Sequence, residues 1–307
     1  MTEIQNLLQK TSRTFALTIP FLPQPTRAEV EVAYLLFRIV DTFEDGALWT
    51  PRRRIDALGR FIELLASDPA AAAPLVAECA AEPPVARTDY MDLLAEMPLV
   101  LSSLAALRLP ARAAIRRHVT RSAVGMATFI RRAGGDGTLA LQTIRDLREY
   151  CYCVAGIVGE MLTELYLLGR PALAGVAKEL ESRAVAFGEG LQLVNILKDA
   201  QRDAEEGRTY LPRRAPLSEV VALAANDLAT ATEYVDLLTS AGAESGLVAF
   251  NSSISKLALA NLQILRDRGL GAKLSRLQVA QIQAEVLRSA LGSTGYESSI
   301  GAVSTHE

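Results

Sequence analysis

Two apolar segments that each carry one line of polar side chains restrict the fold more than any other feature. Read as a helix, residues 192–203 place four polar side chains at i, i+3, i+7 and i+11 on one face: Gln192, Asn195, Asp199 and Asp203. Apolar residues surround this line, so the helix is expected to be largely buried and its polar side chains need partners. The aspartates fall near the expected C-terminus, where the helix dipole disfavours negative charge. A bound cation would remove this conflict.

The segment 26–46 repeats the pattern about 160 residues earlier in the chain. Thr26 and Glu29 fit a capping box at its start. Its polar line comprises Tyr34, Arg38, Asp41 and Asp45, which lie at i, i+4, i+7 and i+11 on one helix face. A single Asp-x-x-x-Asp pair is typical of a solvated helix face. Two copies on apolar helices favour one shared site instead.

Composition and patterning both indicate an all-α protein. Hydrophobic residues make up 50% of the 307 residues and aromatic residues 6%, and no strand-like alternation of useful length occurs. We expect one helical domain over residues 1–291, with an apolar interior behind the polar lines. The Gly-, Ser- and Thr-rich segment 292–307 is expected to be a disordered tail.

Charge and cysteine usage exclude several functional classes. A net charge of −3 argues against nucleic acid as a partner. Three cysteines and two histidines form neither a disulfide framework nor a zinc set, and we expect free thiols. The sequence shows neither a signal peptide nor an apolar run long enough to cross a membrane, so a soluble cytoplasmic protein is expected. It carries no signal for a particular oligomeric state.

Two carboxylate pairs without a histidine or cysteine cluster select a hard, oxygen-binding cation. Mg²⁺ is usually held by one or two carboxylates together with substrate phosphates, so a phosphate-bearing ligand is expected. The basic residues available for its oxygens are Arg13, Arg38, Lys198 and Arg208. There is no P-loop, and the apolar interior indicates a diphosphate with a hydrocarbon tail. A phosphohydrolase of lipid diphosphates and a non-catalytic cation- or lipid-binding protein are the alternatives.

Three further patterns allow more than one interpretation. Gly156 and Gly159 interrupt an apolar helix expected over 147–168, where they permit either close helix packing or a smooth wall for a long apolar ligand. The acidic pair Glu160 and Glu164 is interpreted as structural or surface-exposed. The arginine run 52–54 is interpreted as a solvated face, with a phosphate-facing lid as the alternative.

The sequence resembles the squalene/phytoene synthase family over roughly residues 5–290. The matching motifs are Ser12-Arg13-Thr14-Phe15, the segment YLLFRIVDTFED at 34–45, YCYCVAGIVG at 150–159, the line at 192–203, and GRTYLP at 207–212. The resemblance implies a single-domain, all-helical isoprenoid synthase fold with a central cavity. It also implies an enzyme, a prenyltransferase that couples two prenyl diphosphates head to head.

The resemblance also implies a role for each matching residue. The metal ligands for two or three Mg²⁺ ions would be Asp41, Asp45, Asp199 and Asp203. The substrate diphosphates would be bound by Ser12, Arg13, Arg38, Gln192, Asn195, Lys198 and Arg208. Tyr34, Arg38 and Tyr150 would act near the reacting carbons. Lys198 stands where relatives often have arginine, so a point charge replaces a planar fork.

The last reaction step distinguishes the members of this family. Reduction by NADPH would give squalene from two farnesyl diphosphates through presqualene diphosphate, and the segment 271–276 with Lys273 and Arg276 resembles a basic loop near NADPH. We favour squalene synthesis. The alternatives are dehydrosqualene or, from geranylgeranyl diphosphate, phytoene, and release of presqualene diphosphate alone. An insoluble hydrocarbon product would be consistent with peripheral membrane contact.

Overall fold

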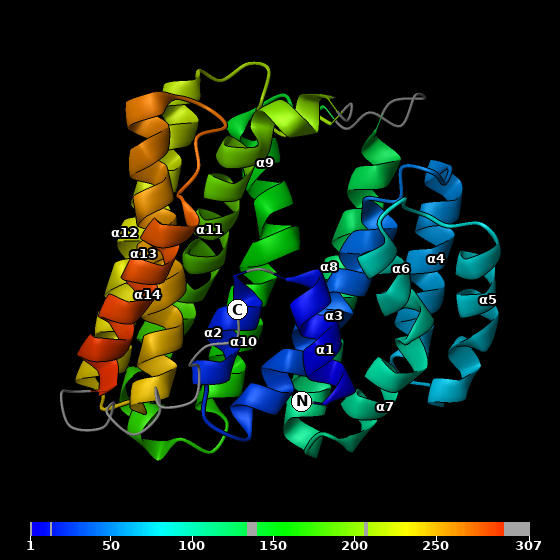
Figure 1. The fold of residues 1–307 in the computed structure, drawn as a ribbon, viewed down its shortest axis with the longest axis horizontal. Helices are drawn as coiled ribbons and strands as arrows, with labels where there is room; N and C mark the ends of the chain where they lie inside the picture. Colours follow the sequence, from blue (N-terminus) through cyan, green and yellow to red (C-terminus); the bar gives the residue numbers. More distant parts are fainter. Residues whose placement is uncertain (1, 13, 134–139, 206–207, 292–307) are drawn as a thin grey trace, which may run out of the picture.

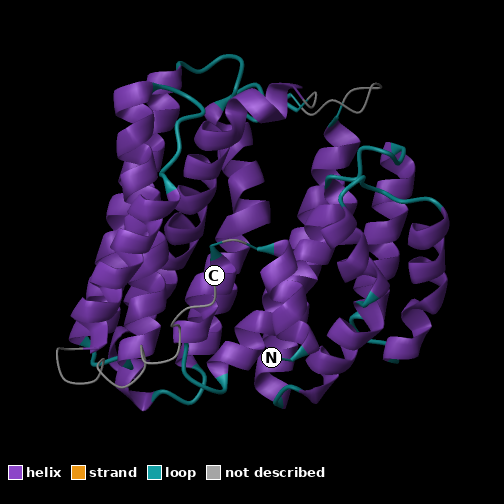
Figure 2. Cartoon of the chain, in the orientation of Figure 1, coloured by secondary structure: helices purple, strands orange, loops and turns teal. Residues whose placement is uncertain are grey.

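The structure, a computed structural model, describes residues 2–12, 14–133, 140–205 and 208–291. Helices account for the regular structure of these residues, and Figure 2 shows no strand among them. Ala140 and Thr209 form one isolated bridge. The all-α prediction is confirmed. The expected tail, 292–307, lies outside the described residues.

The N-terminal half forms a group of helices drawn mostly on the right of Figure 1. It contains α1 (Glu3–Thr11), α2 (Phe15–Thr18), η1 (Ile19–Phe21), α3 (Thr26–Glu44), α4 (Pro51–Leu64), η2 (Pro69–Ala72), α5 (Ala73–Ala81), α6 (Thr88–Ala95), α7 (Met97–Ala106) and α8 (Leu109–Arg132). The second half contains α9 (Ile144–Cys151), η3 (Tyr152–Gly156), α10 (Ile157–Leu167), η4 (Pro171–Val176), α11 (Ala177–Glu205), α12 (Leu217–Ser240), α13 (Ser245–Arg268) and α14 (Arg276–Leu291).

The two helices with polar lines are α3 and α11, one in each half of the chain. Apolar side chains bury α3 on most sides, with Leu35, Leu36 and Ile39 fully enclosed. Helix α11 packs against α10 and α12, and its Leu193 and Leu197 are buried. Both helices are therefore rigid, buried elements, and each presents its polar line toward the interior of the molecule.

The start of α3 differs from the expected capping box. Helix α3 begins at Thr26 with Pro25 in the cap position and no side-chain cap. The Thr26 hydroxyl instead accepts a hydrogen bond of 2.8 Å from Arg170. The Glu29 carboxylate pairs with Arg108 from the start of α8. The prediction of a capping box was wrong because two arginines distant in sequence bind the side chains that the box would use.

The apolar helix expected over 147–168 is interrupted by a π-helical turn, η3. The Ser122 hydroxyl of α8 donates a 2.7 Å hydrogen bond to the carbonyl of Cys153 within this turn. The wider turn moves Val154 and Ala155 into the wall of the cavity described below. Single π turns of this kind occur frequently at functional sites.

Glycines bring the second-half helices into close contact around this turn. A Cβ atom at Gly159 would lie 2.0 Å from the carbonyl oxygen of Ala184, and one at Gly188 would lie 2.1 Å from that of Ala155. Gly159 and Gly188 also line the cavity. Both interpretations of the glycine pattern therefore apply at Gly159: the helices pack closely and the cavity wall is smooth.

Two predictions about charged residues have different outcomes. The acidic pair on α10 is structural, because Glu160 pairs with Arg121 at 2.7 Å and Glu164 with His118 at 2.9 Å, both on α8. The arginine run on α4 is not a purely solvated face. Arg53 binds Glu78 at 2.8 Å, and Arg54 donates to the carbonyl of Glu44 at the end of α3.

Within the described ranges, no helix combines the length and the apolar character needed to cross a membrane.

Candidate active site

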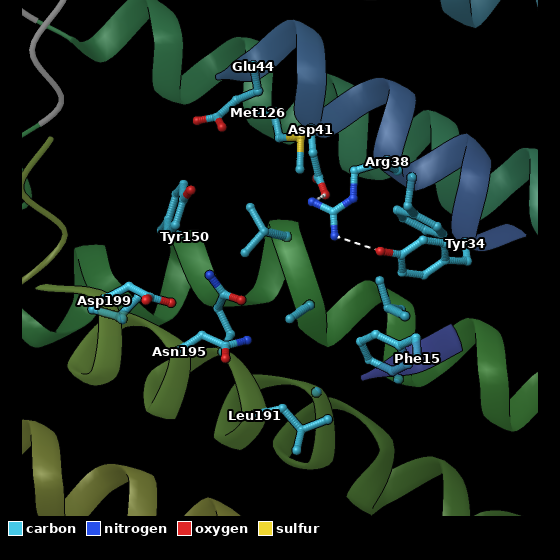
Figure 3. Close-up of a pocket in the computed structure, with 18 of the residues that line it drawn as sticks. Phe15, Tyr34, Arg38, Asp41, Glu44, Met126, Tyr150, Leu191, Asn195 and Asp199 are labelled. Atoms are coloured by element: carbon cyan, nitrogen blue, oxygen red, sulfur yellow. Dashed lines mark hydrogen bonds and ion pairs between the residues drawn. The ribbon is translucent and has the colours of Figure 1, made fainter. Parts of the chain in front are cut away.

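A cavity of about 430 Å³ lies between α3 and α11. Its volume falls within the range of roughly 300–1,000 Å³ that is usual for ligand pockets. Figure 3 shows α3 on one side and α11 on the other, with their polar side chains directed into the space between them. The cavity brings together ten of the residues singled out from the sequence: Tyr34, Arg38, Asp41, Asp45, Tyr150, Gln192, Asn195, Asp199, Asp203 and Arg208.

On the α3 side, Arg38 is the centre of a small network. Its Nη2 atom donates a 3.0 Å hydrogen bond to the hydroxyl of Tyr34, and Nη1 lies 3.3 Å from Asp41 (Figure 3). The Tyr34 hydroxyl in turn donates to the backbone carbonyl of Thr11 at 3.1 Å. The guanidinium is thereby held at the cavity wall, where it can bind an anion.

On the α11 side, basic residues surround Asp199. Lys273 from the loop before α14 lies 2.9 Å from its carboxylate, and Lys198 and Arg202 lie within 3.7 and 3.8 Å. Lys198 also donates to the side chain of Asn195 at 2.7 Å. These cations offset the placement of an acid in the last turns of the helix.

Arg208 connects the acids of the two helices. Its guanidinium lies 3.4 Å from Asp45 of α3 and 3.8 Å from Asp203 of α11. Carboxylates separated by more than 150 residues in sequence therefore share one cation and one cavity. The two polar lines thus border one cavity.

Burial and neighbouring charges shift the acids in different directions. The pKa of Asp41 is raised to about 6, because burial outweighs the lowering effect of Arg38 and Asp45 adds a smaller raising contribution. Burial also raises the pKa of Asp203, against Arg208 and Arg202. Although burial acts in the opposite direction, Lys273 and Lys198 hold the pKa of Asp199 below its usual value. Asp199 thus keeps its negative charge more readily than Asp41 or Asp203.

Glu44 and Tyr210 are among the cavity residues that the sequence analysis missed. Glu44 on α3 lines the cavity, and burial together with Asp45 and Asp41 raises its pKa well above the usual value. Tyr210 stacks on Tyr150, with ring centres 4.9 Å apart. Both residues stand inside the motifs quoted above, Glu44 in DTFED and Tyr210 in GRTYLP, so inspection of every polar position in those motifs would have found them.

Beyond the polar side chains, the cavity is apolar. Its wall includes side chains from α2, η1, α3, α10, α11 and α13, among them Phe15, Ile19, Phe37, Leu162, Phe187 and Ile254. A ligand that fits this space has a charged head and an apolar body. Each CH₂ group buried there would contribute about 0.8 kcal/mol to binding.

Those of the remaining predicted site residues that the structure describes lie outside the cavity wall. The Ser12 hydroxyl accepts a 3.0 Å hydrogen bond from the backbone N–H of Phe15, the first residue of α2. Lys198 and Lys273 reach the site through Asp199, and Arg276 is exposed at the start of α14. Arg13 lies outside the described residues.

The donor set of the cavity can be compared with that of a metal site. Within the described part of the chain, no three His, Cys, Asp or Glu side chains group closely enough to form a protein-only metal cage. Mg²⁺ seldom uses such a cage, because one or two carboxylates and substrate phosphates complete its shell. The oxygen-only acids on two facing helices fit that mode of binding.

Comparison with known proteins identifies the family. The family model described as squalene/phytoene synthase matches residues 8–221, more than half of the chain. The chain belongs to the squalene/phytoene synthase family. The matched range contains both polar lines and the π turn, and it ends within α12.

Curated relatives of this family extend the match. The squalene synthase of Eremothecium gossypii is 30% identical over 224 residues, which cover 73% of this chain and 47% of that protein. The Botryococcus squalene synthase of Botryococcus braunii is 29% identical over 67% of this chain and 41% of its own length. The phytoene synthase of Thermus thermophilus is 45% identical, over 25% of this chain and 24% of that protein. The chain spans about half the length of the squalene synthases that it matches.

Solved structures share the fold. TcSQS in complex with the ligand E5700 superposes with a TM-score of 0.75 at 24% identity, over 94% of this chain and 88% of that chain. A dehydrosqualene synthase in complex with a ligand superposes with a TM-score of 0.57 at 20% identity, over 94% of this chain and 95% of that chain. The isoprenoid synthase fold expected from the resemblance is therefore confirmed.

Proposed function

We propose that the protein is a prenyltransferase that joins two molecules of farnesyl diphosphate head to head and forms squalene through presqualene diphosphate. The observation that carries this proposal is the cavity itself. It combines carboxylates and arginines from α3 and α11 with an apolar interior, in a chain of the squalene/phytoene synthase family. A diphosphate head matches the charged residues of the cavity, and a prenyl tail matches its apolar interior.

The basic residues of the site would bind and orient the two diphosphates. Arg38 and Arg208 present guanidiniums that can bind phosphate oxygens at two points. Gln192 and Asn195 of α11 also line the cavity and can supply amide donors. Holding both substrates in one cavity would align the allylic carbon of one with the double bond of the other, which converts a bimolecular step into an effectively intramolecular one.

The tyrosines would act where positive charge develops. Burial, Glu44 and Tyr210 raise the pKa of Tyr150, so its side chain stays a neutral phenol. A phenol ring close to a carbocation stabilises it through its negative face. The apolar wall would exclude water, which otherwise captures the cation as an alcohol.

Two groups would be supplied from outside the chain. We propose that Asp41, Asp45, Asp199 and Asp203 hold Mg²⁺, which when bound stabilises the negative charge of the leaving diphosphate. We further propose NADPH as the reductant, with Lys273 and Arg276 as candidates for its phosphates. Lys273 lies 2.9 Å from Asp199, so the basic loop borders the site and its donors fit an anionic cofactor.

Product analysis tests the proposal. The protein would be incubated with farnesyl diphosphate and Mg²⁺, with and without NADPH, and the hydrocarbons would be identified by mass spectrometry. We expect squalene only when NADPH is present. Formation of dehydrosqualene with and without NADPH would support the proposed condensation and exclude the proposed reduction. Farnesol as the only product would indicate a phosphohydrolase. A separate incubation with geranylgeranyl diphosphate in place of farnesyl diphosphate tests for phytoene.

A matched pair of variants links the product to the cavity. Asp199→Asn should lower turnover on the order of 100-fold or more, because the acid faces the leaving group. Glu181→Gln removes the same charge from an exposed position at the opposite end of α11 and should leave turnover unchanged. Equal activity of the two variants would contradict the proposed site.

A further inference from the structure

The orientation of Arg38 is only partly determined by residues of its own helix. Its two Nη atoms contact Tyr34 and Asp41, as described above. Its Nε atom is buried and finds no hydrogen-bond partner among the described residues. Additional contacts to the guanidinium therefore matter for its position, because a side chain with several rotatable bonds is otherwise free to swing.

Such a contact comes from α6, a helix that does not line the cavity. The guanidinium carbon of Arg38 lies 5.6 Å from the centre of the Tyr90 ring. The guanidinium carbon of Arg87 lies 3.9 Å from the centre of the same ring, and its Nη1 donates a 2.9 Å hydrogen bond to the Tyr90 hydroxyl. One aromatic ring is thus shared by two cations.

The surroundings of Tyr90 hold its ring in this place. Arg87 is itself anchored by Asp89, whose carboxylate accepts a 3.1 Å hydrogen bond from Nε. The carboxylate offsets the positive charge of Arg87, which would otherwise repel Arg38. The negative face of the ring attracts a guanidinium within about 6 Å, more strongly where the pair is shielded from water.

We propose that Tyr90 is a positioning residue for Arg38 and that α6 is therefore part of the diphosphate-binding machinery. Tyr90 restricts the guanidinium to the orientation that faces the cavity, and Arg87 holds the Tyr90 ring in place. This inference rests on the proposed function in one respect: Arg38 binds a substrate diphosphate.

The first test measures binding of inorganic pyrophosphate by calorimetry in the presence of Mg²⁺, with the full chain. Tyr90→Leu should weaken binding about three- to thirtyfold, because it removes the ring. Tyr90→Phe keeps the ring and should bind within about twofold of the unmodified protein. Asp92→Asn is the control on the same helix: it breaks the exposed ion pair of Asp92 with Lys10, 2.7 Å long, and should not change binding.

The second test needs no ligand. The NMR signal of the Arg38 Nε–H group reports the environment of the guanidinium, and its hydrogen exchange reports how often the group reaches water. Tyr90→Leu should shift this signal and accelerate its exchange about tenfold or more, while Tyr90→Phe and Asp92→Asn should preserve both.

The two tests separate failure of this inference from failure of the proposed function. An unmodified protein that does not bind pyrophosphate would contradict the proposed function, while the NMR comparison still decides whether Tyr90 positions Arg38. Binding that is unchanged in Tyr90→Leu would overturn the inference alone. A loss in Tyr90→Phe equal to that in Tyr90→Leu would also overturn it, because the ring would then not be the cause.

Discussion

At the scale of single residues, the second half of the chain contains a buried ionic cluster apart from the cavity. Glu189 of α11 and Asp227 of α12 are 3% and 5% exposed, and Arg148 of α9 lies 2.9 Å and 3.7 Å from them. Burial raises the pKa of Glu189 to about 7, with Arg148 opposing and Asp227 adding to the shift. Two buried acids thus share one arginine.

This cluster predicts a pH-dependent stability. The folded pKa of Glu189 is above its unfolded value, so folding favours the protonated form. Its stabilising contribution is complete below about pH 4.5 and is lost as the pH rises through about 7. Glu189→Gln cannot ionise and should therefore gain stability relative to the unmodified protein as the pH increases from 5 to 8.

Urea unfolding of both proteins across this pH range measures the effect. The quantity of interest is the difference between their unfolding free energies, because titrating groups outside the cluster of Glu189, Asp227 and Arg148 contribute equally to both. A difference that stays constant from pH 5 to 8 would show that Glu189 is ionised throughout.

At the scale of elements, the approach of α10 to α11 determines the shape of the cavity. A Cβ atom at Gly159 would lie 2.0 Å from a backbone oxygen of α11, which no side-chain rotation can relieve. Gly159→Ala should therefore separate the helices, destabilise the protein by about 2 kcal/mol or more, and reduce activity.

A second glycine provides the matched control. Apart from the neighbouring backbone of its own helix, Gly59 on α4 has no atom within 4 Å of the position that a Cβ would take. Gly59→Ala should stabilise the protein by about 0.5–1 kcal/mol, because it restricts the unfolded chain and favours the helix. Thermal unfolding of the two variants gives both values, and destabilisation of the same size in each would contradict the close-packing explanation.

At the scale of the whole molecule, the site joins two helices whose main packing partners differ, while α10 contacts both of them. Helix α3 packs against α4, α7 and α8, whereas α11 packs against α10, α12 and α13. Arg208 contacts acids of both helices, at Asp45 and Asp203. A ligand that binds both polar lines should therefore stabilise the molecule as a unit.

Inorganic pyrophosphate with Mg²⁺ tests this expectation. At a concentration about 100 times the Kd, the ligand should add about 2.7 kcal/mol and raise the Tm by roughly 5 °C. Hydrogen exchange should slow in both α3 and α11. Asp199→Asn should lose most of the shift and Glu181→Gln should keep it, and an equal shift in Asp199→Asn would place the ligand elsewhere.

The sequence alone predicted the helical class and the two polar lines, because both depend on local periodicity. Apolar and polar residues that recur at helical spacing define a buried helix and its polar face without knowledge of any partner. The segment 26–46 corresponds to α3, which spans Thr26–Glu44. We predicted one shared site because acids on two largely buried helices both need partners for their charge.

Other features were decided only by tertiary packing. Arg170 and Arg108 replace the expected cap of α3, Arg208 spans two helices, and Tyr90 contacts Arg38 from a helix about fifty residues away. The π turn arises where α8 and glycine contacts constrain an otherwise regular helix. Each of these depends on distances between residues remote in sequence, and such distances exist only once the helices have packed.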